Sequence, residues 1–149
     1  MASSPREKSA DAGSAYALDE QIGFILRKVS QRHTSIFAAA FGNDLTPPQW
    51  AVLAKLHESG PTSQNQLGRL VALDAATNKG VVDRLATRGL TETSPDPADA
   101  RRVLVALTDA GRKEVERGFP IAAAITEETL APLDATQRAQ LIALLKALS

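Results

Sequence analysis

Hydrophobic residues recur at helical spacing along most of the chain. The longest stripe covers residues 18–41 and ends before Gly42. Several later stripes begin at residues that commonly cap helices; the fourth follows Asp74, and the last follows Asp134, which can form a capping box with Gln137. Pro120 is expected to kink a helix rather than end it. Helices are therefore predicted over residues 18–41, 46–59, 62–71, 75–88, 108–130 and 134–148.

A different pattern lies between Gly89 and Thr108. Residues 90–94 and 102–107 are short and rich in Val, Leu and Thr, and a proline-containing loop separates them, which predicts a β-hairpin. The third and fourth helices are joined by only a few residues, 71–74, as in a helix-turn-helix. The predicted fold is therefore mostly α with a small β-hairpin, a winged helix-turn-helix.

Composition sets limits on this picture. The 149 residues suit one domain, and 17 basic against 17 acidic side chains leave anion binding to local patches. The absence of Cys excludes disulfides and fits a reducing cytosol, so a cytoplasmic protein is expected. Residues 1–17 are expected to form a disordered arm and not a signal peptide. No apolar run is long enough for a membrane span, so no membrane partner is expected.

Several motifs resemble those of the MarR (multiple antibiotic resistance regulator) family of ligand-responsive bacterial repressors. The strongest is D-x-R-x-x-x-V-x-L-T-x-x-G, from Asp99 to Gly111. L-T-x-x-Q-W-x-V-L from Leu45 to Leu53 also fits, as do a Gly-Pro turn at 60–61, Thr77, and the D-R-L and G-L pairs at 83–85 and 89–90. The resemblance covers residues 18–148. The first helix is also similar to the branch of the family that controls nicotinate catabolism.

The resemblance implies a homodimer in which the first and the last two helices form the interface and two winged lobes face DNA. We therefore expect one domain over residues 18–149, with the winged lobe at about 45–110 and dimerisation helices at about 18–42 and 111–149. The residues alone favour the same assembly. The first helix and the stripe from Leu141 to Leu148 are apolar surfaces that one lobe cannot cover.

Polar residues of the two predicted helix-turn-helix helices are candidates for contacts with DNA. On the fourth helix, residues 75, 78, 79 and 82 are expected near one side, whereas Val81 and Leu85 face the core. Asn can pair with adenine and Lys with guanine. The predicted contacts are Asn78 and Lys79 for bases, and Thr77, Arg84, Ser63, Gln64 and Asn65 for phosphates. A solvated helix face and plain helix capping are the alternative interpretations.

The proline-stiffened loop between the predicted strands carries two arginines. Asp99 lies two residues from Arg101, close enough to orient its guanidinium toward a narrow minor groove. Arg102 is expected to meet a phosphate or solvent. The alternative is an exposed turn with a weak surface ion pair.

Aromatic and histidine side chains suggest a pocket for a small molecule. His33 and Phe37 are four residues apart on the first helix, and Trp50, Leu53 and His57 share a face of the second. Where these faces meet, stacking and hydrogen bonds suit a flat aromatic acid. The resemblance implies that effectors bind at this junction. Core packing is the alternative, and Arg27 is only a weak candidate for the cation that anchors the acid.

The function predicted from these features is that of a sequence-specific DNA-binding repressor. An inverted-repeat operator on double-stranded DNA is its expected partner, released by a small aromatic acid such as a hydroxylated nicotinate. No metal, cofactor or enzyme activity is expected, because HExxH, P-loop, GxGxxG and serine-elbow motifs are absent. Two alternatives stay open: a winged-helix protein-interaction module without DNA binding, and a small metal-dependent enzyme.

Overall fold

The structure, a computed structural model, describes residues 15–149. Residues 1–14 of the disordered segment predicted for residues 1–17 lie outside this range. A 3₁₀ turn (Leu18–Glu20) comes first, followed by α1 (Ile22–Phe41), α2 (Pro47–Ser59), β1 (Thr62–Ser63), α3 (Gln64–Leu70), α4 (Ala75–Thr87), β2 (Thr91–Pro95), β3 (Val103–Leu107), α5 (Asp109–Leu130) and α6 (Ala135–Ala147). Within the described range, no helix has the length and apolarity that crossing a bilayer requires.

The predicted fold class, mostly helical with a small β-hairpin, is confirmed. The first helix is shorter than predicted, because Gln21 is extended and separates α1 from the preceding 3₁₀ turn. The sheet also has a third strand that was not predicted: β1 pairs antiparallel with β3, placing Thr62 opposite Val105. Pro120 lies inside α5, which continues to Leu130.

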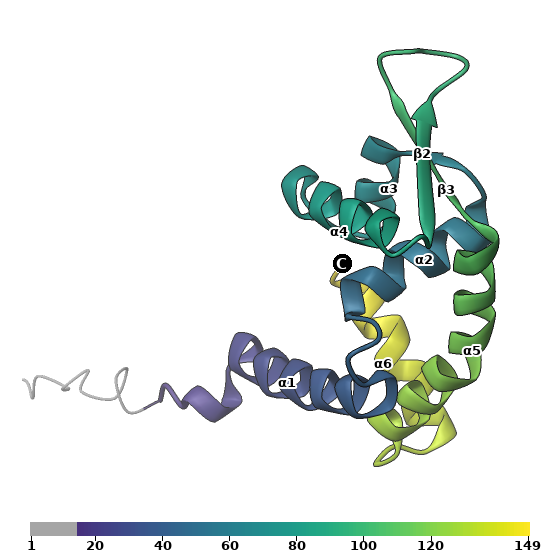
Figure 1. The fold of residues 1–149 in the computed structure, drawn as a ribbon. Helices are drawn as coiled ribbons and strands as arrows, with labels where there is room; N and C mark the ends of the chain where they lie inside the picture. Colours follow the sequence, from purple (N-terminus) through teal and green to yellow (C-terminus); the bar gives the residue numbers. More distant parts are fainter. Residues whose placement is uncertain (1–14) are drawn as a thin grey trace, which may run out of the picture.

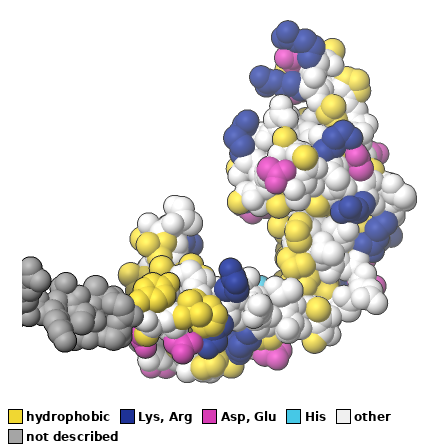
Figure 2. All heavy atoms as spheres, turned by 90° about the vertical axis from the view of Figure 1, so that its left-hand side faces the viewer, with side chains coloured by type: hydrophobic (Ala, Val, Ile, Leu, Met, Phe, Trp, Pro, Cys, Tyr) yellow, Lys and Arg dark blue, Asp and Glu magenta, His cyan; other side chains and the backbone are white. Residues whose placement is uncertain are grey.

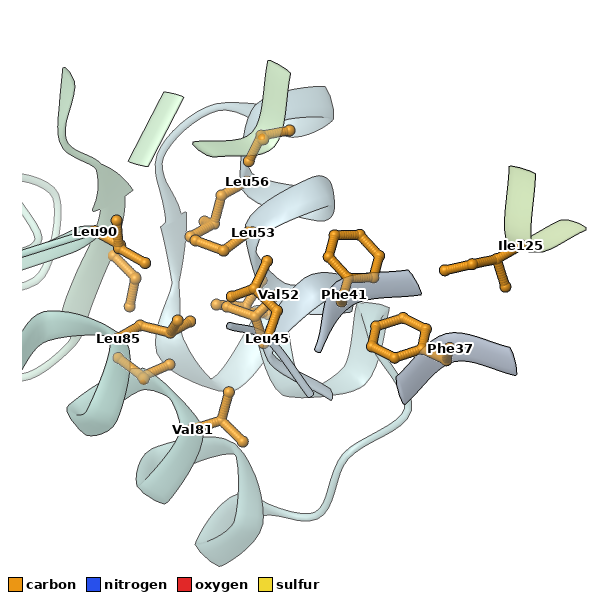
Figure 3. Packing of buried hydrophobic residues seen from close by; sticks show 14 of the residues in the cluster. Phe37, Phe41, Leu45, Val52, Leu53, Leu56, Val81, Leu85, Leu90 and Ile125 are labelled. Atoms are coloured by element: carbon orange, nitrogen blue, oxygen red, sulfur yellow. The ribbon is translucent and has the colours of Figure 1, made fainter. Parts of the chain in front are cut away.

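The helix-turn-helix and the hairpin form one lobe, and α1 extends from it as an arm (Figure 1). Helix α5 connects the two parts, since it packs against both α1 and α2. The hydrophobic core is centred on α2, whose Val52, Leu53 and Leu56 are nearly or fully inaccessible. Figure 3 shows these side chains between those of α4, such as Leu85, and those of α1, such as Phe37. The core therefore fixes the lobe to the base of the arm.

The arm and the last helix present apolar side chains to solvent. On and before α1 these are Tyr16, Leu18, Ile22, Ile25, Leu26 and Val29, and on and just after α6 they are Ile142, Leu144, Leu145 and Leu148. Figure 2 shows hydrophobic side chains gathered on the arm. No residue of α6 is buried. Exposed apolar surface on this scale is typical of a protein interface.

The contacts where the wing meets α5 explain why the motif that begins at Asp99 ends with Thr108 and Gly111. The Thr108 hydroxyl donates a hydrogen bond to the Gly89 carbonyl at 2.6 Å and accepts one from the Gly111 amide at 3.0 Å. A β-carbon at Gly111 would lie 1.9 Å from the Leu90 carbonyl oxygen. Only glycine permits this approach, so Thr108 and Gly111 together hold α5 against the end of α4.

Candidate nucleic-acid interface and ligand cavity

Helix α4, the second helix of the helix-turn-helix, begins at a cap that the sequence predicted. Asp74 accepts hydrogen bonds from the Thr77 amide and the Thr77 hydroxyl, both at 2.8 Å. These bonds, the amide first, hold the pKa of Asp74 below its ordinary value. The exposed Thr77 hydroxyl donates its one hydrogen to Asp74, so in this structure it has no hydrogen left to donate to a phosphate.

The structure corrects the predicted orientation of α4. Asn78 is only 2% exposed, and Val82 is fully buried, although both were expected on the solvent side. Together with Val81 and Leu85 they form one buried stripe at i, i+3, i+4 and i+7. Helix α4 packs against α2, α3 and β2, so its buried arc is wide and includes the one polar member, Asn78. In this structure Asn78 is therefore not presented to a DNA base.

Two basic residues of α4 remain on its exposed side. Lys79 is 65% exposed at its side chain and pairs with Asp83 at 2.8 Å. Arg84 is also exposed. An exposed ion pair of this kind is worth little to the fold, so the Lys79 ammonium is readily available to another partner.

The wing arginines are organised by one carboxylate. Asp99 Oδ1 accepts hydrogen bonds from the Arg101 amide at 3.0 Å and from Arg101 Nε at 3.2 Å. Arg102 Nε lies 3.7 Å from Asp99 Oδ2. The Arg101 side chain, then its amide, then the charge of Arg102 keep the pKa of Asp99 below its ordinary value. Arg101 is nonetheless 91% exposed at its side chain, so it is oriented without being covered.

A polar cleft of 240 Å³ lies between α3 and the wing. Its lining residues are Ser63, Gln64, Asn65, Arg69, Arg101, Arg102 and Val103. The structure thus brings together residues predicted separately from the third helix and from the wing. Arg69 was missed; it is exposed on α3, four residues after Asn65 and so on the same side of the helix. Three arginines converge here in a chain with no net charge, and dark blue side chains crowd the wing end in Figure 2.

A second cavity, of 140 Å³, lies where α1, α2 and α5 meet. It is lined by His33, Phe37, Trp50, Ala122, Ile125 and Thr126. The first three were predicted to share a pocket, and the last three, all from α5, were missed. Leu53 is not part of the lining because it is fully buried in the core. His57 lies elsewhere, with its ring edge-on to Phe119 at 5.1 Å between centroids.

The polar groups of this cavity come from two helices. His33 Nδ1 is 2.8 Å from the Thr129 hydroxyl, near the end of α5. The neighbouring Arg32 donates to the carbonyls of Thr129 and Glu128 at 2.7 and 2.9 Å, so its guanidinium is occupied by the end of α5. Neither Arg27 nor any other Lys or Arg is among the described residues that line the cavity. Its polar side chains are His33 and Thr126.

Trp50 forms a wall of the cavity and is held on several sides. Its ring packs against Phe41 at 5.3 Å and edge-on against Phe119 at 5.9 Å between centroids. On the α5 side, a β-carbon at Gly118 would lie 2.3 Å from Trp50 Cζ3. Glycine at this position lets the indole lie directly against the α5 backbone.

Across residues 15–149, no group of three His, Cys, Asp or Glu side chains is arranged to hold a metal ion. Two hollows of the described part of the chain bring together residues that the sequence predicted as functional: an arginine-lined cleft between α3 and the wing, and an aromatic cavity between α1, α2 and α5.

A winged helix-turn-helix with basic groups on its second helix and wing defines the class of DNA-binding transcriptional regulators. The family model described as MarR family matches residues 45–103. The chain is 41% identical over 132 residues to the HTH-type transcriptional repressor NicR of Pseudomonas putida, covering 88% of this chain and 84% of that protein. The chain thus belongs to the MarR family, as its motifs indicated.

Two solved structures are similar over nearly their whole length. A probable transcriptional regulator from Pseudomonas aeruginosa is 54% identical, with a TM-score of 0.86, covering 89% of this chain and 100% of that one. BpsR of Bordetella bronchiseptica, whose DNA binding is regulated by 6-hydroxynicotinic acid, is 40% identical with a TM-score of 0.87, covering 89% and 96%.

Proposed function

We propose that this chain is a homodimeric repressor that binds an inverted-repeat operator and releases it when a small aromatic acid occupies the cavity between α1, α2 and α5. The observation that carries the proposal is the position of this cavity, because its walls belong both to the arm and to the DNA-facing lobe. A ligand there contacts both parts at once.

The DNA side of the proposal rests on Lys79 and Arg84 of α4 and on the cleft beside the wing. Lys79 is proposed to reach bases in the major groove, since its ammonium is exposed and only weakly engaged. Arg84, Arg69 and the start of α3 are proposed to meet phosphates. Arg101, oriented by Asp99, is proposed to enter the minor groove.

Dimerisation is supported by the apolar side chains that α1 and α6 leave exposed. They lie on the chain's two terminal helices, and pairing with a second copy would remove them from water. A two-fold dimer presents two α4 helices, so its operator should be an inverted repeat with half-site centres about 10 bp apart.

The effector is proposed to be a single-ring acid, with a hydroxylated nicotinate as the first candidate. The cavity, at 140 Å³, is smaller than the ~300–1,000 Å³ of drug-sized sites. Phe37 and Trp50 offer ring faces for stacking, and His33 offers an imidazole to a carboxylate or ring hydroxyl. The similarity to NicR and to BpsR, which responds to 6-hydroxynicotinic acid, supports the same class of ligand.

Release is proposed to follow from a shift between two dimer conformations. A ligand that binds one conformation more tightly changes the spacing of the two α4 helices and so the affinity for the operator. A ligand that binds the Nε2 of His33 would also be linked to the end of α5, because His33 Nδ1 contacts the Thr129 hydroxyl.

The test begins by selecting bound fragments from random DNA. Operator affinity is then measured with 6-hydroxynicotinate, nicotinate and a dihydroxybenzoate in turn. We expect at least one acid to weaken binding, and His33→Ala to blunt that response while operator affinity stays near wild type. If none of the three acids weakens operator binding, the proposed effector class is wrong. If His33→Ala responds to the acid as the wild type does, the effector does not bind in this cavity.

A further inference from the structure

We propose that Asn78 is a positioning residue: its side-chain amide ties α4 to α3 and so sets the angle at which α4 meets DNA. The inference rests on the proposed operator binding. It assigns Asn78 a role different from the base contact that its residue type suggests, because the side chain is buried inside the lobe.

Asn78 is a polar residue on an otherwise apolar stripe. The three other buried positions of α4 are Val81, Val82 and Leu85. A buried amide costs free energy unless its donors and acceptors are satisfied. Asn78 Nδ2 donates to the Gln64 carbonyl at 2.9 Å, whereas Asn78 Oδ1 accepts no hydrogen bond from any described residue. An apolar side chain at this position would cost less free energy to bury. The role proposed for asparagine here therefore rests on its hydrogen bond to the Gln64 carbonyl.

The bond joins the beginnings of two helices. Asn78 lies in the first turns of α4, and Gln64 is the first residue of α3, 14 residues earlier. Gln64 also lines the cleft that faces the wing arginines. One hydrogen bond therefore couples the helix that carries Lys79 to the edge of the proposed phosphate-binding cleft.

Gly68 makes this close crossing possible. A β-carbon at Gly68 would lie 3.3 Å from Asn78 Nδ2 and 3.3 Å from the Leu73 carbonyl oxygen. Such distances are tighter than ordinary van der Waals contact. Glycine thus leaves room for the amide between α3 and α4, and the two residues act as one joint.

The consequence concerns the accuracy of DNA reading. Base contacts require side chains held to within about 0.5 Å and 10–20° of the productive geometry. Lys79 directly follows Asn78, so a rotation or tilt of α4 at this joint moves its ammonium. Contacts to phosphates carry no sequence information, so weakening them lowers the affinity for operator and random DNA alike. Loss of the joint should therefore reduce discrimination between operator and random DNA more than it reduces binding to any DNA.

The experiment compares Asn78→Leu with a matched control, Val82→Ala, which truncates the same buried stripe one turn later without touching the joint. Dimer formation and helix content are confirmed by sedimentation and circular dichroism, and both affinities are measured well below the melting temperature. We expect Asn78→Leu to lose about tenfold or more in the ratio of operator to scrambled-duplex affinity. Val82→Ala should change this ratio by less than about twofold, even if it melts at a lower temperature.

Wild-type protein is measured first, which separates the two proposals. A wild-type dimer that binds no operator would refute the proposed function and this inference with it. A wild type that binds, together with Asn78→Leu that discriminates equally well, would refute only the role of Asn78.

Gly68→Ala provides a second, independent variant should Asn78→Leu fail to fold. Its methyl group should displace the Asn78 amide and reduce the affinity ratio by at least about threefold in the wild-type background. In an Asn78→Ala background the same methyl group meets no amide, and only its 3.3 Å approach to the Leu73 carbonyl oxygen remains, so the further loss should be clearly smaller than in the wild-type background. Equal losses in both backgrounds would show that Gly68 and Asn78 act separately, which would overturn the inference.

Discussion

Replacing Gly118 by alanine is expected to displace the indole of Trp50 and to disturb the ligand cavity. The added β-carbon would lie 2.3 Å from Trp50 Cζ3 and 2.8 Å from Cη2. Non-bonded carbon atoms rest at about 3.5–4.0 Å, so the ring or the α5 backbone has to shift by about 1 Å. Phe41 and Phe119 already pack against the ring and restrict where it can go.

The magnitude follows from two opposing effects. Overpacking a well-packed site costs about 1–3 kcal/mol, whereas alanine in a helix interior is about 1 kcal/mol more favourable than glycine. Gly80→Ala is the matched control, since a β-carbon at Gly80 would meet nothing within 4 Å. The two variants should therefore differ by about 1–3 kcal/mol in the free energy of unfolding. At about 2–4 °C per kcal/mol, that is a difference of about 2–12 °C in melting temperature.

The assay uses the chain's one tryptophan. Thermal melts are compared at equal protomer concentration, because association makes the melting temperature concentration-dependent. Fluorescence emission then reports the surroundings of Trp50 directly, and its quenching reports effector binding. We expect shifted emission and weaker effector binding in Gly118→Ala but not in Gly80→Ala. If Gly118→Ala melts as high as Gly80→Ala, with wild-type emission and effector affinity, the contact between Gly118 and Trp50 does not shape the cavity.

Three further predictions concern the wing and the dimer. Arg101→Ala should leave the melting temperature nearly unchanged but weaken operator binding by about 1–3 kcal/mol in fluorescence anisotropy. Wild-type affinity in this variant would show that the wing is a structural turn that does not contribute to DNA binding through Arg101. Asp99→Asn should weaken binding less, and should add little once Arg101 is gone, because the two act as a unit. Leu144→Asp combined with Leu148→Asp should give monomers or unfolded chains in sedimentation, since charge would enter the dimer contact; an unchanged dimer would place the interface elsewhere.

The order of elements could be predicted because its signals are local. Thr46 with Gln49 and Asp134 with Gln137 form the capping boxes that their spacing indicates. Gly89 adopts a positive φ of 73° just after α4, as a residue at that position commonly does. Each signal lies within a few residues of the feature that it specifies. The strand β1 escaped prediction for the same reason, because two residues carry no periodic pattern.

The orientation of α4 was predicted wrongly. The prediction puts Asn78 near one side with Ala75, Lys79 and Val82, and its amide suits a base. In the structure Asn78 instead stands at the first position of the buried stripe that continues through Val81, Val82 and Leu85. The periodicity alone would have placed it inside. Its partner, the Gln64 carbonyl, is a backbone atom of another helix and leaves no trace in the sequence.

The ligand cavity was predicted only in part because it depends on long-range packing. His33, Phe37 and Trp50 lie on two helices that are consecutive in the chain, so their meeting could be inferred. Ala122, Ile125 and Thr126 come from α5, and only the packing of α5 against α1 and α2 brings them to the cavity. Leu53 shares a side of α2 with Trp50, yet that side is divided between the core and the cavity.

The most direct test of the central claim measures operator binding with and without effector on one sample. The wild-type dimer is titrated against a selected inverted repeat in fluorescence anisotropy, and 6-hydroxynicotinate is then added to the complex. We expect tight binding to a site with half-site centres about 10 bp apart, steep weakening with salt, and release by the acid. Binding as a monomer to an asymmetric site, or a complex that no single-ring aromatic acid dissociates, would contradict the claim.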